Sequence, residues 1–413
     1  MNASQGGAVD VVIVGGGHNA LTAAAYLAKA GKRVVLLEAS DHLGGAAVST
    51  QAFDGVEARL SRYSYLVSLL PQQIIDDLEL DISLVRRRYS SYTPDPADPT
   101  RGLLVDNEAS DDERARAFER VDAGSDLVPW HDWYASTTAL AGALFPTLTQ
   151  PLPTRSQVRA AVVSAAQAAG VDGEALWRDV IDRPIGEAID RRFTSDLVRG
   201  VVATDALIGT FAELDGGDLA ANRCYLYHVI GGGTGDWDVP VGGMGAVSGA
   251  LARAASDAGA QLLTGARVRA VSPDGDVQYV RDGASHEVHG EVVLSGVAPA
   301  VLEELLTASL GLPPGPRSAV EGAQVKVNLL LTRLPKLRDT EVDPTAAFAG
   351  TFHINELATQ LAHAYRDADA GRVPSPLPCE IYCHTLSDRS ILGVELAASQ
   401  AQTLTVFGIH VPD

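Results

Sequence analysis

Lysine, cysteine and methionine are all scarce in this chain of 413 residues. It has three cysteines and two methionines, and only four of its 32 basic residues are lysine. The formal net charge is −20. An acidic surface repels polyanions, so this balance argues against nucleic-acid binding and against simple electrostatic docking on anionic lipid. Three cysteines also exclude a framework of several disulfides.

Long apolar runs are missing as well. The longest charge-free stretch, residues 133–154, contains three prolines and several polar residues. It would make a poor membrane-spanning helix, so we expect a core helix and leave peripheral contact with a membrane open. The first ten residues lack the basic start and apolar core of a secretory signal. We therefore expect a cytoplasmic protein, with the Ala- and Arg-rich composition of a bacterial gene.

Several kinds of catalytic site have no counterpart in the sequence. It shows neither the context of a Ser-His-Asp triad nor a nucleophile elbow. Its helical region, 125–200, has no metal-type cluster, and we predict no metal site. Cys379 and Cys383 lie in a strand-like stretch, which separates them by roughly 13 Å at about 3.3 Å per residue. A disulfide needs Cα atoms within about 7 Å, so we predict thiols and no redox pair.

Residues 9–46 have the pattern of a strand, a glycine-rich turn, a helix and a second strand. The apolar run at 11–14 suits a buried parallel strand. Glycines at 15–17 follow at once, a helical pattern runs to about residue 30, and Gly31 can end it with a positive φ. A second apolar strand, 33–38, closes the unit.

The glycine spacing in this unit is typical of a dinucleotide site. Gly15 permits the tight turn, Gly17 lets the backbone approach a pyrophosphate, and the small Ala20 allows the helix to pack closely on the strand. The helix start at His18 and Asn19 presents free N–H groups and a positive dipole end to phosphates. We therefore predict nucleotide binding, with a degenerate structural copy as the alternative.

The residues after the second strand favour FAD over NAD. Glu38 stands where a carboxylate accepts hydrogen bonds from ribose hydroxyls and repels a 2′-phosphate, with Ala39 beside it. Gly44 and Gly45 follow in an E-x5-G-G pattern. Flavoproteins with two dinucleotide-binding domains carry this pair against the FAD diphosphate. An ordinary Gly-Gly turn is the alternative.

The rest of the chain predicts a second domain threaded through the first. Residues 125–200 are mostly helical in pattern, and 315–413 alternate strands with helices in a way that fits a mostly antiparallel sheet. The strand-like stretch 286–299 can join the first domain. We expect an α/β protein: a Rossmann-like FAD/NAD(P)-binding domain (1–70 plus 235–312) interleaved with an α+β substrate domain (71–234 plus 313–413).

Two further features are ambiguous. Arg62 could contact a phosphate or a flavin carbonyl, or could be a surface arginine. The glycines at 242–245 open a helix whose N–H groups could meet the cofactor. They could instead only cap that helix.

Segments spread over nearly the whole chain resemble the phytoene desaturase-like flavoproteins, and within them the subfamily called pyridine nucleotide-disulfide oxidoreductase domain-containing protein 2. These segments are GGGHNALTAAAYLA (15–28), LEASDHLGGAA (37–47), SRYSYLVSLL (61–70), ATDALIGT (203–210), VGGMGAVSGALA (241–252), GTFHINE (350–356) and PCEIYCHTLSD (378–388).

The resemblance implies specific roles in FAD binding. Gly15, Gly17 and Ala20 would hold the diphosphate, and Glu38 would hold the adenosine ribose. Gly44 and Gly45 would contact the second edge of the diphosphate, and the backbone of Val268 would meet the adenine.

The chain departs from the family pattern in two places. Many relatives have Arg where this chain has Ala46. Relatives also continue past Asp413 with a Gly-rich motif and a helix that cover the isoalloxazine ring, and nothing after residue 300 supplies that motif. We expect a fragment or incomplete gene product; completion by a separate chain or unusual FAD binding are the alternatives.

The resemblance implies hydride transfer between the flavin and a C–H or C=C bond of an apolar small molecule, with the hard chemistry supplied by the cofactor. If a base is needed, His353 is the first candidate, followed by Tyr63 and Asp205, although each could be structural. The alternatives are an amine or amino-acid oxidase and a non-catalytic regulatory protein with the same fold. The substrate and the electron acceptor (oxygen, quinone or nicotinamide) stay open.

Overall fold

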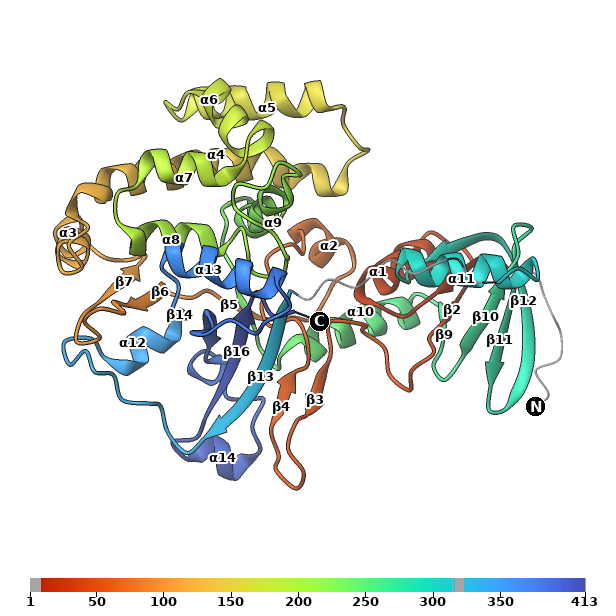
Figure 1. Ribbon diagram of the computed structural model, residues 1–413. Helices are drawn as coiled ribbons and strands as arrows, with labels where there is room; N and C mark the ends of the chain where they lie inside the picture. The colour runs from red at the N-terminus through yellow and green to blue at the C-terminus, as the bar shows by residue number, and fades with distance from the viewer. Residues whose placement is uncertain (1–8, 314, 316–322, 413) are drawn as a thin grey trace. The chain divides into compact units, whose positions relative to one another are not determined.

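A computed structural model describes residues 9–313, 315 and 323–412, which form two compact units (Figure 1). Among the described residues, unit 1 comprises 9–66, 72–83, 240–313 and 315, and unit 2 comprises 67–71, 84–239 and 323–412. The interleaving of two domains matches the expectation from the sequence. The short strands β5 (Leu84–Val85) and β8 (Val239–Pro240) stand where the chain passes from one unit to the other.

A six-stranded sheet forms the centre of unit 1, in the order β10-β11-β12-β1-β2-β9. β12, β1, β2 and β9 run parallel, and β10 and β11 extend the sheet as antiparallel neighbours of β12. The predicted strand at 286–299 is thereby confirmed as part of this domain. The strands are β1 (Val9–Val14), β2 (Val34–Leu37), β9 (Gln261–Leu263), β10 (Arg267–Val271), β11 (Asp276–Arg281) and β12 (Ala284–Ser295).

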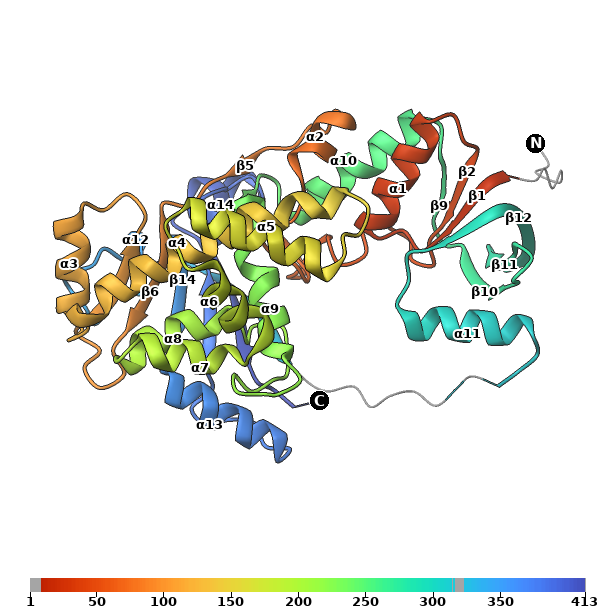
Figure 2. The same cartoon turned by 90° about the horizontal axis from the view of Figure 1, so that it is seen from above.

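Helices cover both faces of this sheet, because alternate residues of a buried strand point to opposite sides. Val11 and Ile13 of β1 pack with α1 (His18–Lys29) and α10 (Met244–Asp257). Val12 and Val14 belong to the cluster on the other face, together with Leu305 of α11 (Pro299–Ser309). Figure 2 shows α1 and α10 side by side, with α11 on the opposite side of the strands.

The segment after residue 71 returns to unit 1, which the predicted boundary at residue 70 misses. It contains α2 (Gln72–Asp77), and Leu78 and Leu80 bury their side chains in the cluster beneath α1. The Tyr26 hydroxyl donates a hydrogen bond to Asp77 Oδ2 at 2.8 Å. Two apolar anchors and this bond explain why the segment belongs here. A hairpin of β3 (Ser49–Gln51) and β4 (Arg59–Ser61) completes this part of unit 1.

Unit 2 is built on a second six-stranded sheet, in the order β13-β16-β15-β14-β6-β7. Every neighbouring pair is antiparallel except β14 with β6, which confirms the mostly antiparallel sheet. The strands are β6 (Tyr89–Pro94), β7 (Gly102–Asp106), β13 (Gln324–Leu331), β14 (Thr351–Ile354), β15 (Cys379–Tyr382) and β16 (Gln402–Ile409).

Helices make up most of the remainder of unit 2, as the pattern over 125–200 predicts. They are α3 (Asp111–Glu119), α4 (Leu127–Leu144), α5 (Arg155–Ala168), α6 (Gly173–Trp177), α7 (Ile185–Arg192), α8 (Asp196–Thr204), α9 (Ala220–Val229), α12 (Pro344–Ala349), α13 (Ala358–Asp369) and α14 (Val394–Ala398). Trp130 and Trp133 are core residues of α4. In the part of the chain that the structure describes, no helix combines the length and apolarity needed to span a membrane.

The two faces of the unit 2 sheet differ in polarity. Tyr92, Phe352 and Ile381 lie in an apolar cluster that includes residues of α12. The alternate positions of the same strands carry polar side chains, among them His353 and Glu380, and these are buried as well. A sheet with one buried polar face has to satisfy those groups internally or with a ligand.

Helix α8 covers this polar face at very short range. A Cβ added to Gly200 would lie 1.8 Å from the carbonyl oxygen of Glu356. Only glycine permits that approach, which places the next turn of α8 over the strands. Thr204, four residues further along, thereby reaches Glu380, and its hydroxyl donates to Glu380 Oε1 at 2.5 Å.

We predict that Gly200→Ala lowers the free energy of unfolding by at least about 2 kcal/mol, since backbone must move to admit one methyl group. Gly142→Ala is the matched control, because Gly142 lies in α4 with nothing within 4 Å of an added Cβ. It should be neutral or stabilise by up to about 1 kcal/mol. Denaturant unfolding of both variants checks this; equal effects would contradict the close approach.

Candidate functional site

The glycine-rich turn of unit 1 leaves the start of α1 open. Gly15 has φ +96°, which suits glycine, and Gly17 is the N-cap with an extended backbone. A Cβ added to Gly17 would meet nothing within 4 Å, and no side chain caps this end of the helix. The first turn carries no acidic residue either. An uncapped helix start with free space in front of it suits a phosphate group.

The second glycine pair lies against this turn. Gly17 and Gly44 form an isolated parallel bridge, and the Gly44 N–H donates to the Gly16 carbonyl oxygen at 2.8 Å. A Cβ on Gly45 would lie 2.9 Å from the Cα of Gly17. Residues that are far apart in the sequence therefore form one backbone surface with few side chains, as a diphosphate site needs.

Glu38 is held by two backbone donors. Gly16 N–H donates to Oε2 and Ser40 N–H donates to Oε1, each at 2.7 Å. A carboxylate has about four lone-pair sites, so both oxygens can accept further hydrogen bonds from ribose hydroxyls. The half-buried Ala39 continues this turn, which is also fixed by the Ala266 N–H on the Glu38 carbonyl oxygen. That bond brings the start of β10, with Val268, close to Glu38.

Ala20 packs closely against Gly296, a neighbour that the sequence did not indicate. A Cβ on Gly296, just after β12, would lie 2.9 Å from the Ala20 Cβ. The small residue at position 20 therefore lets α1 approach the end of β12. His18 and Asn19, the first residues of α1, are exposed.

The glycine-rich segment 242–245 fits the alternative in which it only caps the helix that follows. The N–H groups of Met244 and Gly245 donate to the hydroxyls of Ser61 and Ser49, at 3.1 and 3.0 Å. These donors are occupied within unit 1, whereas the α1 end has no such side-chain cap. Arg62 is exposed, and its guanidinium carbon lies 5.1 Å from the centroid of the Tyr63 ring. This position fits the alternative of a surface arginine.

The unit 1 residues fit the ADP part of FAD. The open space at Gly17 and the uncapped start of α1 would receive the diphosphate, with Gly15, Ala20, Gly44 and Gly45 shaping the backbone around it. Glu38 would take the ribose. Each of these roles was expected from the sequence, and the structure brings their residues together.

The three candidate bases do not share one unit. Tyr63 belongs to unit 1 and is half exposed. His353 and Asp205 belong to unit 2, where His353 is buried on β14 and Asp205 follows α8 directly. His353 accompanies two acidic residues that the sequence reasoning missed, Glu356 and Glu380.

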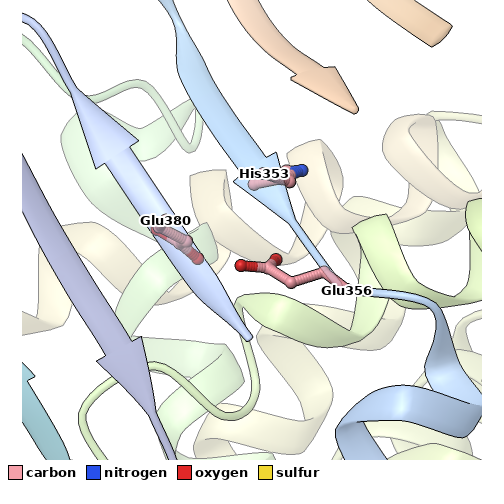
Figure 3. A group of neighbouring side chains, drawn as sticks. All are labelled: His353, Glu356 and Glu380. Carbon is pink, nitrogen blue, oxygen red and sulfur yellow. The ribbon is translucent and has the colours of Figure 1, made fainter. Parts of the chain in front are cut away.

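These three residues form what we call the buried triad. His353 and Glu380 are direct cross-strand partners of β14 and β15 and therefore share a face. Asn355, with φ +57°, turns the chain after β14 and directs Glu356 to the same place. One possible ligand atom from each lies within 4.8 Å of the other two. Figure 3 shows the two carboxylates turned toward each other, with His353 above them in the view.

Two members of the triad are held by hydroxyl groups. Thr93 Oγ1 and His353 Nδ1 are 2.8 Å apart. Glu380 accepts from Thr204 and from the Tyr382 hydroxyl. Glu356 is 1% exposed, and neither of its carboxylate oxygens has a hydrogen-bond partner. The sequence did carry a signal for the two acids, because HINE (353–356) and CEIY (379–382) each place an acid in or beside a strand-like stretch.

Burial changes the proton affinities of these groups. It lowers the pKa of His353 to about 3, with a contribution from the positive charge of Arg87. An imidazole with so low a pKa is a weak base, which argues against the role predicted for His353. Burial raises the pKa of Glu380, and raises that of Glu356 well above 4.5 with help from the neighbouring Glu380.

Asp205 is better matched to proton transfer near neutral pH. Burial raises its pKa to about 6, and the positive charge of Arg87 opposes this rise. A general base works best when its pKa lies near the operating pH. The pKa of Asp205 therefore lies closer to neutral pH than that of His353, and the catalytic roles of these residues stay predictions.

We predict a pH-dependent effect of Asp205→Asn on stability. The pKa of Asp205 is raised from 3.8 to about 6 in the folded protein. The folded state therefore holds the proton more tightly than the unfolded state, and the resulting stabilisation is complete below pH 3.8 and is lost as pH rises through about 6. Asparagine does not titrate. As pH rises from 4 to 8, the free energy of unfolding of the variant should therefore increase relative to that of wild type by up to about 3 kcal/mol. Unfolding of both proteins across this range checks it, and a constant difference would contradict the shifted pKa.

Comparisons with known proteins agree with this geometry. Residues 13–72 match the model of the NAD(P)-binding Rossmann-like domain, and residues 134–332 match that of the flavin containing amine oxidoreductases. An uncharacterized protein of Mycobacterium tuberculosis is 53% identical over 98% of this chain and 74% of its own length. The wild-type putrescine oxidase structure, bound to putrescine, has a TM-score of 0.56 at 18% identity over 97% of this chain and 75% of that one. At this identity, the similarity shows that the two proteins share a fold.

A named relative in the rat shows the family. The pyridine nucleotide-disulfide oxidoreductase domain-containing protein 2 of Rattus norvegicus is 30% identical over 98% of this chain and 74% of its own length. The chain has no disulfide in its described part, and its three cysteines are free. The chain belongs to the family of pyridine nucleotide-disulfide oxidoreductase domain-containing protein 2, and it is an FAD-dependent oxidoreductase in which residues 134–332 match the flavin containing amine oxidoreductases.

Proposed function

We propose that this oxidoreductase moves a hydride between FAD and a C–H or C=C bond of an apolar small molecule, as a dehydrogenase or desaturase. The open, uncapped start of α1 beside Glu38 and the second glycine pair carries the cofactor part of this proposal. When bound, FAD supplies the hydride chemistry. The residues of unit 1 hold the ADP moiety and keep its ribose and diphosphate in a fixed orientation.

The apolar character of one segment of unit 2 supports the choice of substrate. Helix α4 carries no charged side chain from Trp133 to its end at Leu144. The chain then continues through an uncharged stretch in which Leu148 is 48% and Leu152 is 97% exposed. Exposed apolar side chains suit an apolar ligand or the membrane surface from which such a ligand is taken. Peripheral membrane contact is therefore part of this proposal.

An amine oxidase is the second candidate. The match of residues 134–332 to the flavin containing amine oxidoreductases and the likeness to putrescine oxidase favour it. A protonated amine would need an ionised carboxylate near its nitrogen. The buried carboxyl groups of unit 2 have raised pKa values, so at neutral pH they favour the uncharged form. We therefore place this activity second.

We predict that Gly17→Val weakens FAD binding by more than about tenfold without destabilising the apoprotein. The added side chain would occupy space reserved for the diphosphate, yet it meets no protein atom within 4 Å of its Cβ and the extended backbone accepts valine. Flavin absorbance of the purified protein and FAD titration measure binding; thermal unfolding without FAD measures stability.

Gly249→Ala is the control for this substitution. Gly249 lies in α10 of the same unit, and its added Cβ would make one ordinary contact, 3.5 Å from Arg253 Nη1. This variant should bind FAD as wild type does. Equal affinity of Gly17→Val and wild type would place the diphosphate elsewhere, and a wild-type protein that stays colourless with added FAD would overturn the proposed function.

We predict that an unsaturated hydrocarbon dispersed in detergent reduces the bound flavin without oxygen, whereas primary amines and diamines do not. Stopped-flow absorbance follows the reduction, and mass spectrometry should detect loss of H2 from the hydrocarbon. Reduction by an amine, with peroxide released in air, would identify the second candidate instead.

A further inference from the structure

We propose that the buried triad, His353, Glu356 and Glu380, binds one divalent first-row transition-metal ion, of the Zn²⁺ or Mn²⁺ class. The triad offers one imidazole nitrogen and two carboxylates, with one atom of each inside a space 4.8 Å across. Ligands at about 2.1 Å from an ion lie about 3.4 to 4.2 Å apart, so modest side-chain rotations would close this cage.

The unpartnered carboxylate of Glu356 is the strongest sign of a missing ligand. A buried carboxylate without hydrogen bonds is costly, and buried acids are normally paired or bound to metal. Glu356 is almost fully buried, and both of its oxygens lack a protein partner. Figure 3 shows that its carboxylate points toward that of Glu380. Both of its oxygens are thus available to an ion.

The hydrogen bonds of the other two ligands are compatible with a metal site. The tautomer in which His353 Nδ1–H donates to Thr93 leaves the lone pair of Nε2 for an ion. Thr204 and Tyr382 hold the Glu380 carboxylate through their hydroxyl groups. Such outer hydrogen bonds fix the ring and carboxylate orientations that a metal site needs.

The charge of the surroundings matches a dication. Glu356, Glu380 and Asp205 interact electrostatically, and Arg87 is a positive group that acts on both Asp205 and His353. Full ionisation of these three acids against one guanidinium leaves two negative charges in a buried region. Protons can neutralise them, and so can one divalent ion.

The ligand set selects the kind of ion. Ca²⁺ and Mg²⁺ prefer all-oxygen ligands, whereas an imidazole with carboxylates suits Zn²⁺ and other first-row ions. With all three side chains at most 2% exposed, exchange through the folded protein should be slow. We therefore expect the ion to enter during folding and to survive brief chelation.

Metal content of the purified protein tests this inference and needs no flavin or substrate. Wild type is produced with added Zn²⁺ or Mn²⁺, dialysed briefly against EDTA and analysed by inductively coupled plasma mass spectrometry. We expect about one ion per chain in wild type. Glu356→Gln and His353→Gln should each retain less than about a tenth of that, because each loses a direct ligand.

His363→Gln is the matched control for adventitious binding. His363 lies on α13 of the same unit with its side chain 58% exposed. This variant should keep the wild-type metal content. Thr204→Val should keep one ion at saturation but bind it about 10- to 100-fold more weakly, because it loses only an outer hydrogen bond to Glu380.

Two results would overturn the inference. Wild-type protein without a stoichiometric ion from either medium would do so by itself, even if a variant failed to fold. A Glu356→Gln variant with the full wild-type metal content would also do so, since it would place the ion elsewhere. A folded variant is verified by circular dichroism before its metal content is compared.

Discussion

The close approach of α8 to the sheet of unit 2 is the constraint on which the chemistry of this unit depends. Because position 200 has no side chain, the helix backbone comes within contact of Glu356 and seals one face of β14 and β15. That face carries polar residues, and the seal removes water from them. The pKa shifts of His353, Glu356 and Glu380 all have burial as their largest cause, and the packing of α8 contributes to that burial.

A related use of small residues builds the site in unit 1. There Gly296 lets β12 approach Ala20, and Gly45 lies directly against Gly17. The result differs, because the small residues of unit 1 leave open space at a helix start whereas Gly200 eliminates space. Open backbone donors suit a phosphate, and closed polar side chains suit a proton or a metal ion.

The sequence groups the residues of the unit 1 turn, whose individual roles in FAD binding stay predictions, but it does not group the residues of the buried triad, and the difference has a physical reason. The strand, turn, helix and acid of the first site follow one another within residues 9–46, so spacing alone determines their geometry. The triad depends on the register of β14 with β15 and on contacts with α8, which join residues 204, 353–356 and 380. The sequence singled out His353 for its polar setting. HINE and CEIY place two acids in or beside strand-like stretches, but the sequence does not reveal the strand pairing that brings them to His353, nor the burial that lowers its pKa.

The contrast between Glu38 and Glu356 shows how surroundings assign different tasks to the same side chain. Glu38 accepts two backbone N–H groups and keeps lone pairs directed at a half-buried surface, so neutral hydroxyl groups suffice as further partners. Neither carboxylate oxygen of Glu356 has a hydrogen-bond partner, because the nearby Thr204 hydroxyl donates to Glu380, and Glu356 faces that second carboxylate in a buried space. A neutral hydroxyl would satisfy one lone pair there but leave the repulsion between the acids. Only a proton or a cation removes it, which is why the second site calls for positive charge and the first does not.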